Sequence, residues 1–324
     1  MLDIEFFRSG FNNYLEKKLI SKAPLNLYEP ITYIMDLGGK RLRPILTLIS
    51  TDVFGGNYEE AMDAALAIEI FHNFSLVHDD IMDAAPLRRG EKTVHKKWDI
   101  NTGILSGDVM LINSYQYFEN YPPELFKSLL KVFSKTAIEV CEGQQYDMDF
   151  EACEDVTIPD YLKMITYKTA VLVAAALKMG AIISNASLNS QDAIYDYGIN
   201  LGIAFQLQDD YLDAFGDPET FGKQVGGDII ENKKTFLYLK SIEIGTEDQI
   251  NELKDLFSIK PANPKDKIET VKAIYIQSGA AELIKKEIKH YTKQAFQLLE
   301  SIETPENKKE ILKEFGNKLM NREV

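Results

Sequence analysis

Two five-residue segments carry the residues best suited to chemistry in this chain. Each has three aspartates in the pattern Asp-Asp-x-x-Asp, at 79–83 (DDIMD) and at 209–213 (DDYLD). On a helix, the first and last aspartates of such a segment lie on one face, about 5–6 Å apart at Cβ. Such carboxylate pairs suit Mg²⁺, which proteins hold through one or two carboxylates together with phosphate oxygens and water. Two such segments on facing helices could hold a metal cluster over a diphosphate.

Acidic residues on a helix often form no more than a solvent-exposed face, and each segment taken alone allows this alternative. The neighbouring residues argue against it. Phe74, Leu76 and Val77 precede the first segment, and a largely apolar run at 203–207 precedes the second. Like charges at this spacing destabilise a helix by a few tenths of a kcal/mol, so each pair needs a positive partner. We interpret both segments as binding sites.

Positive residues near these acids indicate a site for anions. The segment GGKRLRP at 38–44 contains three cations, and RRG at 88–90 begins five residues after Asp83. Arginine binds phosphate oxygens in a bidentate fork, and lysine supplies a mobile charge. In a chain of net charge −14, this grouping predicts a diphosphate site in preference to an exposed helix start. The cations singled out are Lys40, Arg41, Arg43, Arg88, Arg89, Lys168, Lys223 and Lys233.

Histidine and cysteine contribute less. His72 lies seven residues before Asp79, about 20° away on a helical wheel, so it shares the acidic face and is a candidate for contact with a phosphate. His78 points elsewhere and is interpreted as structural. Cys141 and Cys153 are expected to be small buried residues. No motif for nucleotide binding, for a serine hydrolase or for a zinc protease occurs in the sequence.

The elements that must position these residues are predicted to be helices. Long proline-free runs are rich in good helix formers, and their apolar residues recur at helical spacing. Residues 170–183 contain a single charge and are expected to be buried at the centre of a bundle. No linker, charge block or fixed repeat divides the chain, and 258–267 is interpreted as a loop between outer helices. We expect one all-α domain over residues 1–324.

Composition restricts the class of protein. The 324 residues include 36 Lys and Arg against 50 Asp and Glu, which argues against binding of nucleic acid through phosphate attraction. Two cysteines exclude a disulfide framework and favour a reducing compartment. No apolar stretch approaches about 20 residues, and the start of the chain is not basic and then apolar. We expect neither a transmembrane helix nor a secretory signal. We expect a cytoplasmic location.

Taken together, the motifs resemble those of the trans-isoprenyl diphosphate synthases, the polyprenyl synthetase family, and most closely its short-chain geranylgeranyl and farnesyl diphosphate synthases. These enzymes elongate an allylic diphosphate (dimethylallyl, geranyl or farnesyl) by head-to-tail condensation with isopentenyl diphosphate. The motifs occur in family order: GGKRLRP at 38–44, HNFSLVHDDIMD at 72–83, RRG at 88–90, EGQ at 142–144, KTA at 168–170, FQLQDDYLD at 205–213, GK at 222–223 and GGD at 226–228. The resemblance implies an all-α bundle around a central cavity, usually a homodimer. It also implies three Mg²⁺ per active site, for which Mn²⁺ can substitute.

The resemblance further implies a role for each matched residue. Asp79 and Asp83 match ligands of two Mg²⁺ and Asp209 the principal ligand of the third, with Asp80 and Asp213 in support or acting through water. The positions that contact the allylic diphosphate are matched by Arg88, Lys168, Thr169, Gln206, Lys223 and Lys233. Those that hold the diphosphate of isopentenyl diphosphate are matched by Lys40, Arg43, His72 and Arg89. Because the gap from Lys223 to Lys233 is one residue longer than in some relatives, Lys234 is an alternative to Lys233.

Product length is expected to depend on the residues just before the first aspartate. In this family, bulky residues four, five or eight positions before it close the tunnel into which the product grows. Those positions are Ser75, Phe74 and Phe71. A small residue at 75 leaves the first turn open, and the two rings block long chains. We expect a C20 product in preference to C15, and not C30 or longer.

Two other functions compete with this interpretation. A class I terpene cyclase shares the fold and the ionisation chemistry but needs no site for a second diphosphate, and the cations at 38–44 and 88–90 argue against it. An inactive regulatory subunit of a synthase is expected to lose acids from one segment, whereas both are complete here. Release of diphosphate with and without isopentenyl diphosphate separates all three functions.

Overall fold

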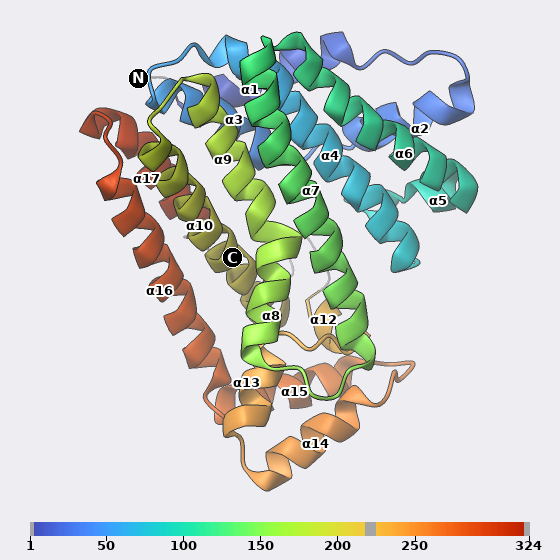
Figure 1. Cartoon of the computed structure of the whole chain (residues 1–324). Helices are drawn as coiled ribbons and strands as arrows, with labels where there is room; N and C mark the ends of the chain where they lie inside the picture. Colours follow the sequence, from blue (N-terminus) through green and yellow to red (C-terminus); the bar gives the residue numbers. More distant parts are fainter. Residues whose placement is uncertain (1–2, 218–224, 321–324) are drawn as a thin grey trace. The chain divides into compact units, whose positions relative to one another are not determined.

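Helices make up nearly all of the regular structure, as the sequence predicts (Figure 1). The structure is a computed structural model that describes residues 3–217 and 225–320. Over these residues the strands are limited to one hairpin, β1 (Leu87–Arg88) and β2 (Glu91–Lys92). The expectation of an all-α fold is confirmed.

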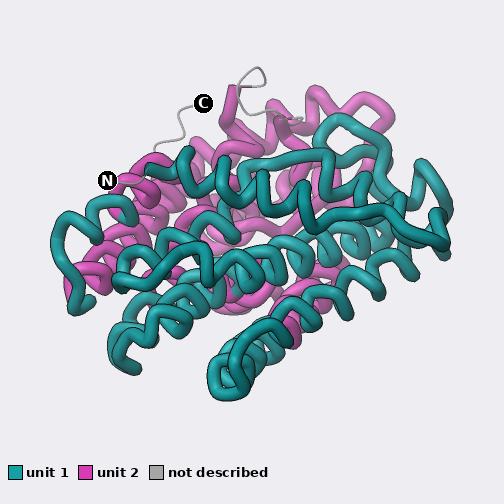
Figure 2. The backbone as a smooth tube through the Cα atoms, turned by 90° about the horizontal axis from the view of Figure 1, so that it is seen from above, with its two compact units in different colours: residues 1–136, 172–195, 302–312 teal, residues 137–171, 196–301, 313–324 magenta. Residues whose placement is uncertain are grey.

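The chain folds into two compact units, each assembled from segments that are far apart in the sequence (Figure 2). Unit 1 comprises residues 1–136, 172–195 and 302–312, and unit 2 comprises residues 137–171, 196–301 and 313–324. The helices α7 (Pro123–Ala152), α10 (Leu188–Phe215) and α17 (Glu306–Met320) each supply residues to both units. The expectation of a single domain over the whole chain stays a prediction.

Unit 1 contains the helices that surround the first aspartate segment. Its elements are α1 (Ile4–Lys18), α2 (Leu25–Asp36), α3 (Leu42–Val53), η1 (Tyr58–Ala61), α4 (Met62–Met82), the hairpin, α5 (Val94–Lys97), α6 (Ile100–Gln116), η2 (Tyr117–Asn120), the first part of α7 (Pro123–Ala152), nearly all of α9 (Val171–Ile183), and parts of α10 (Leu188–Phe215) and α17 (Glu306–Met320). Helix α4 packs against α3 and α6, and most of its residues up to Val77 are buried. It is therefore a core helix that delivers its polar end to the site.

Local signals in the sequence explain where several helices begin. The carboxylate of Asp3 accepts a hydrogen bond from the amide of Phe6 at 2.8 Å, and that of Asp99 accepts from the amide of Thr102 at 2.9 Å. Side chains at this position satisfy amides that the first helical turn leaves without partners. These caps fix the starts of α1 and α6.

Unit 2 contains the second aspartate segment. Its elements are the end of α7, α8 (Ile158–Ile165), a π-helical turn η3 (Thr166–Ala170), the rest of α10, α12 (Gly227–Glu231), α13 (Phe236–Ile244), α14 (Glu247–Phe257), α15 (Lys265–Gln277), α16 (Ala280–Ser301) and the end of α17. A capping box of Thr157 and Asp160 begins α8. The interval between α14 and α15 confirms most of the predicted loop at 258–267, although α15 already begins at Lys265.

One expectation from the sequence is wrong. Cys141 and Cys153 are exposed rather than buried, because Cys141 faces outward from α7 and Cys153 follows that helix at its end. The elements α8 (Ile158–Ile165), η3 (Thr166–Ala170) and α9 join into one helical stretch, Ile158–Ile183, that by length and composition alone could cross a membrane. A buried core helix passes the same test, and 61% of the most apolar window is buried. The burial of Val171–Leu177 confirms the expected core helix.

Candidate functional site

The first aspartate segment lies where α4 ends. Asp79 is in the last turn, and the amide of Asp83 donates a helical hydrogen bond of 2.9 Å to the carbonyl of Asp79. Asp83 is the exposed residue that ends the helix, whereas Asp79 is half-buried and Asp80 is buried. The predicted pairing of Asp79 and Asp83 on one helical turn is therefore present.

The hairpin after α4 presents two arginines. Arg88 ends β1, and Arg89 and Gly90 form the turn, with φ of 56° and 83°. A two-residue hairpin loop with positive φ at both positions matches the twist of the strands. Glycine adopts this conformation without strain, but arginine does not. A strained arginine at a turn is a feature of functional sites, where another interaction must hold it.

Arg88 faces the aspartates of α4. Its Nη2 donates to Oδ1 of Asp80 at 2.6 Å and to Oδ2 of Asp79 at 3.4 Å, and its Nε donates to Oδ1 of Asp80 at 3.0 Å. Burial alone lowers the pKa of Arg88, but the hydrogen bond and charge of Asp80, together with Asp79, raise it overall. Burial raises the pKa of Asp80, against the opposing effect of Arg88. The arginine therefore supplies the positive partner that the acidic segment needs.

The GGKRLRP segment is held by a buried ion pair that sequence analysis missed. Arg41 begins α3 with a φ of 50°, and its Nη1 lies 2.6 Å from Oε1 of Glu69 on α4. Arg41 also donates to the carbonyl of Met35, and Asn73 donates to Oε1 of Glu69 at 3.2 Å. Arg41 is 7% exposed and Glu69 is 2% exposed. Arg41 is thus a structural anchor for the segment and not a surface cation.

Arg43 and His72 form the next pair in unit 1. Their Nη1 and Nε2 atoms are 3.1 Å apart. Burial lowers the pKa of His72 well below its ordinary value, and the charges of Arg43 and Arg89 lower it further. Burial also lowers the pKa of Arg43, to about 10, so this arginine keeps its charge at neutral pH. A neutral His72 accepts a hydrogen bond from the charged Arg43.

Arg89 returns from the hairpin to the glycines at 38–39. Its guanidinium donates to the carbonyl of Gly38. A Cβ at Gly39, where φ is 125°, would lie 2.8 Å from Cζ of Arg89. The absence of a side chain at Gly39 therefore makes room for the arginine. Lys40, the next residue, is exposed. Unit 1 brings together the predicted residues Lys40, Arg43, His72, Asp79, Asp80, Asp83, Arg88 and Arg89.

Unit 2 brings together a second set of predicted residues. Nζ of Lys168, in the π-helical turn, lies 2.6 Å from Oδ2 of Asp147 on α7. Oγ1 of Thr169 donates to Oε1 of Gln206 on α10 at 3.1 Å. Short π-helical segments are rare and often occur at functional sites. The turn thus gives Lys168 and Thr169 different partners on two helices.

The second aspartate segment has a buried centre. Asp210 accepts hydrogen bonds from Nε2 of Gln206 at 2.9 Å and from the hydroxyl of Tyr161. Burial and the charge of Asp228 raise the pKa of Asp210 well above its usual value, although both hydrogen bonds oppose the shift. Asp209 and Asp213 are half-buried. Oδ2 of Asp213 accepts from the amide of Asp228 at 3.1 Å, which explains the GGD motif as a turn folded onto this aspartate.

A cavity of about 110 Å³ lies beside this cluster and is lined by residues of unit 2. Lys233 and Lys234 both reach it. Lys234 donates to the carbonyls of Phe150, at 3.0 Å, and of Cys153, at the end of α7. This arrangement favours Lys233 as the ligand-binding lysine, with Lys234 closing the helix. The predicted residues that line the cavity are Lys168, Thr169, Gln206 and Lys233. Lys223 lies outside the described residues.

The donor set fits a hard divalent cation that is completed by substrate. All five predicted metal-binding residues are aspartates, and Oδ2 of Asp80 is a buried oxygen without a hydrogen-bond partner. Among the described residues, no group of three or more His, Cys, Asp or Glu side chains is close enough to hold a metal ion alone. Mg²⁺ at one or two carboxylates takes its remaining ligands from phosphate and water. The aspartates are therefore suited to a metal that arrives with a diphosphate.

The residues predicted to control product length lie on α4 within an aromatic cluster. The rings of Phe71 and Phe74 are 5.5 Å apart, and Phe71 packs edge-on against Phe133 at 5.2 Å. Phe71 is 1% exposed and Phe74 is 8% exposed. Oγ of Ser75 donates to the carbonyl of His72 at 2.8 Å. The control of product length stays a prediction.

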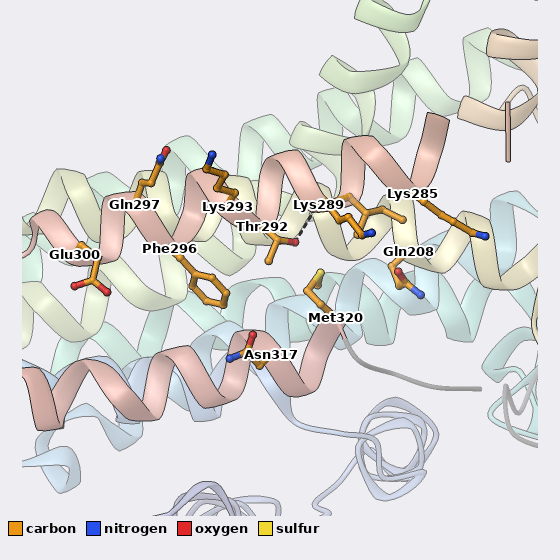
Figure 3. Close-up of a pocket in the computed structure, with 11 residues that line it drawn as sticks. Gln208, Lys285, Lys289, Thr292, Lys293, Phe296, Gln297, Glu300, Asn317 and Met320 are labelled. Atoms are coloured by element: carbon orange, nitrogen blue, oxygen red, sulfur yellow. Dashed lines mark hydrogen bonds between the residues drawn. The ribbon is translucent and has the colours of Figure 1, made fainter. Parts of the chain in front are cut away.

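A larger cavity, of about 560 Å³, lies in unit 2 between α10, α16 and α17 (Figure 3). Lys285, Lys289 and Lys293 project from successive turns of α16, and Phe296 and Met320 supply apolar surface. None of the predicted site residues lines it. The position of the acidic and basic motifs, and not the size of the cavity, identifies the candidate site.

Sequence analysis missed Glu69, Asp147 and Tyr161. The apolar run at 61–71 contains two charged residues, Asp63 and Glu69. An acid within such a run indicates a buried partner. Asp147 follows the EGQ motif by three residues, a spacing that has no general meaning. Nothing in the sequence marks Tyr161, since only the fold brings its hydroxyl to Asp210.

Comparison with known proteins identifies the family. A model of the polyprenyl synthetase family matches residues 24–275. The chain belongs to the polyprenyl synthetase family. It is 40% identical over 261 residues to a short chain isoprenyl diphosphate synthase of Methanothermobacter thermautotrophicus, with 80% of this chain and 79% of the relative covered. It is 36% identical over 258 residues to a geranylfarnesyl diphosphate synthase of Natronomonas pharaonis, which covers 74% and 76% of the two chains.

Solved structures of the polyprenyl synthetase family agree with this assignment. A crystal structure of a geranylgeranyl pyrophosphate synthase superposes with a TM-score of 0.96 at 54% sequence identity, covering 100% of both chains. The resemblance inferred from the motifs is confirmed, and the chain has the helical fold of prenyl synthases.

Proposed function

We propose that this protein is a short-chain isoprenyl diphosphate synthase that condenses isopentenyl diphosphate with an allylic diphosphate. Membership of the polyprenyl synthetase family supports the enzyme class. The observation that carries the reaction is the arrangement of charge at the end of α4, where Arg88 contacts Asp79 and Asp80. An acidic segment and a guanidinium at hydrogen-bond distance suit a diphosphate bound together with its cation.

We assign the residues of the two units to two diphosphates. Asp79, Asp83 and Asp209 hold Mg²⁺, and Asp80 and Asp213 support them. The allylic diphosphate is held by Arg88, Lys168, Thr169, Gln206, Lys223 and Lys233. The diphosphate of isopentenyl diphosphate is held by Lys40, Arg43, His72 and Arg89. The pairing of Arg43 with a neutral His72, and the contact of Arg89 with Gly38, support a common anion site.

These side chains suit a reaction in which the diphosphate itself leaves. Breaking the allylic C–O bond puts negative charge on the departing oxygen, and fixed arginines and lysines stabilise that charge. When bound, Mg²⁺ adds Lewis-acid stabilisation of the same oxygens. The allylic cation needs an apolar environment that excludes water. The alkene electrons of isopentenyl diphosphate form the new C–C bond, and the released diphosphate takes the proton, so no protein nucleophile is needed.

The product is proposed to be geranylgeranyl diphosphate, C20. Relatives named geranylgeranyl (C20) and geranylfarnesyl (C25) diphosphate synthase both match this chain, which supports a product of C20 or C25. The buried rings of Phe71 and Phe74 provide a physical limit on a longer chain. We also propose a cytoplasmic homodimer, in agreement with the family resemblance.

The deciding experiment measures diphosphate release from dimethylallyl, geranyl and farnesyl diphosphate, each with and without isopentenyl diphosphate. A synthase releases diphosphate only when both are present, and the extended product appears in equal amount. Release without isopentenyl diphosphate supports a terpene cyclase instead. No release under either condition, with folded protein and Mg²⁺, supports a regulatory subunit.

A further inference from the structure

Two helices, α7 and α10, pack against the π-helical turn η3, and each carries a glycine at the contact. On α7, a Cβ at Gly143 would lie 2.2 Å from the amide nitrogen of Lys168. On α10, a Cβ at Gly202 would lie 2.6 Å from Cα of Ala170. Real Cβ atoms do not approach backbone this closely. Both helices therefore reach η3 only because these two positions lack a side chain.

Each glycine is followed, one helical turn later, by a polar residue that binds η3. Asp147 lies four residues after Gly143 and forms the 2.6 Å ion pair with Lys168. Gln206 lies four residues after Gly202 and accepts from Thr169 at 3.1 Å. Residues at this spacing share a helix face, so glycine and anchor act on the same side. Helices α7 and α10 therefore contact η3 in the same way, through a glycine and a polar residue one helical turn later.

The two polar residues that bind η3, Gln206 and Asp147, are held differently. Gln206 donates to the buried Asp210, which also accepts from Tyr161 in α8, so this side is a connected network. Asp147 is about one-quarter exposed at its side chain, as is Lys168. A partly exposed ion pair holds less tightly than a buried network, because water screens it. Lys168 therefore depends more on the packing at Gly143 than Thr169 depends on that at Gly202.

We propose that Gly143, Gly202 and Asp147 are positioning residues that clamp η3 and thereby direct Lys168 and Thr169 toward the allylic diphosphate. The inference rests on the proposed function, because it assigns these two side chains to that substrate. It assigns a purpose to the EGQ motif, whose glycine allows α7 to contact the backbone of Lys168. Asp147 lines the cavity beside Lys168, whereas neither glycine is among its lining residues. We assign all three an indirect role, through Lys168 and Thr169.

The test uses Gly143→Ala and Gly202→Ala, with Gly10→Ala as the control. Gly10 is also helical, but a Cβ there would meet only the flexible end of Met62, at 3.6 Å. We expect each of the first two changes to raise the KM for the allylic substrate about tenfold or more, since displacements near 1 Å can cost a hundredfold in rate. The KM for isopentenyl diphosphate should stay within about twofold, and Gly10→Ala should change neither. Equal changes in both KM values, or none, in folded protein overturn the proposal.

If an alanine variant does not fold, Asp147→Asn still tests the clamp, because it removes the charge and keeps the number of heavy atoms. Its control is Asp149→Asn, two residues along the same helix, where the carboxylate accepts only a surface hydrogen bond from Gln145. We expect a several-fold rise in the allylic KM for Asp147→Asn alone. An unchanged or lower value means that Asp147 competes with the substrate for Lys168, which overturns the assignment of Asp147.

Binding of inorganic diphosphate with Mg²⁺, measured by calorimetry, separates this inference from the proposed function. If the wild-type protein binds diphosphate but condenses no prenyl substrates, the proposed function fails and the clamp is still tested. In that case, weaker binding by Gly143→Ala than by Gly10→Ala supports the clamp. Equal affinity of these two variants contradicts it.

Discussion

Nη1 of Arg43 and Nε2 of His72 lie 3.1 Å apart, and the histidine is the neutral partner. The two residues come from α3 and α4 and are 29 positions apart in the chain. Burial and the surrounding arginines keep a proton off His72, so the pair carries one positive charge and not two. This relationship links ligand binding at the site to the dependence of stability on pH.

The first prediction concerns that pH dependence. The pKa of His72 lies well below 6.5 in the folded protein, whereas the unfolded chain takes up a proton near pH 6.5. The unfolded state then binds more protons, so stability is complete above pH 6.5 and falls as the pH decreases, by up to about 1.4 kcal/mol per pH unit. His72→Asn should show a smaller fall between pH 7.5 and 5.5 in urea unfolding. Parallel curves for the two proteins would exclude His72 as the titrating group.

The second prediction concerns the metal-binding acids. Asp79→Ala, Asp83→Ala and Asp209→Ala should each reduce turnover by orders of magnitude, because the bound cation no longer stabilises the leaving diphosphate. The helical circular dichroism should stay unchanged. Asp255→Ala, on the exposed side of α14, is the control and should be fully active. Near-normal turnover in any of the first three variants contradicts the assignment of that residue.

The third prediction separates the two arginines of the hairpin. Arg88 contacts the aspartates and Arg89 contacts the glycine turn, so they should serve different diphosphates. Arg88→Ala should raise the KM mainly for the allylic substrate, and Arg89→Ala mainly for isopentenyl diphosphate. A loss of about 1.5–3 kcal/mol is expected for each charge-assisted hydrogen bond. If both variants affect the same substrate in steady-state kinetics, this division of the pair is wrong.

The fourth prediction concerns the buried Arg41–Glu69 pair. Glu69→Gln leaves the Arg41 guanidinium buried without a carboxylate, which should cost about 3–5 kcal/mol in the free energy of unfolding. Replacing both residues by leucine should cost less, since no charge is left buried. The control is Glu243→Gln, whose surface pair with Lys240 should contribute below about 1 kcal/mol. Equal losses for the buried and the surface variant in urea unfolding would refute the anchoring role of Glu69.

The fifth prediction concerns product length. The double variant Phe71→Ala, Phe74→Ala removes both rings from α4 and should shift the product of farnesyl diphosphate and isopentenyl diphosphate beyond C20. Each Phe→Ala change should also lower the free energy of unfolding by about 3–5 kcal/mol, because it removes a packed ring such as that of Phe71, which contacts Phe133. The assays should therefore be run at low temperature. Phe74→Ala alone is the milder variant. Wild-type product of C30 or above, or an unchanged product from the double variant, contradicts the aromatic limit.

The helical fold and the family could be predicted from the sequence, because their signals are local. Apolar spacing defines helices, and the pentads at 79–83 and 209–213 keep their identity wherever the chain places them. The position of Asp83 at the end of α4 agrees with the expected helical turn. The exposure of Cys141 was not predictable, because its helix presents that side outward and cysteine usually prefers burial.

The partners of the site residues could not be predicted, because they depend on contacts between segments far apart in the chain. Asp147 meets Lys168 across 21 positions and Tyr161 meets Asp210 across 49. The role of Arg41 changed for the same reason. In the sequence it is one of three equivalent cations, and only the buried Glu69 on α4 separates it from Lys40 and Arg43.

At position 89, the positive φ lowers the stability of the protein, whereas the arginine side chain serves its proposed activity. An arginine in this conformation costs about 1–2 kcal/mol relative to glycine, and asparagine tolerates it better. Selection of variants for heat resistance alone should therefore favour Asn or Gly at position 89 and discard the guanidinium that contacts Gly38. Selection for turnover should restore the arginine. Position 89 is thus where engineering of a more robust synthase is expected to lose affinity for its second substrate.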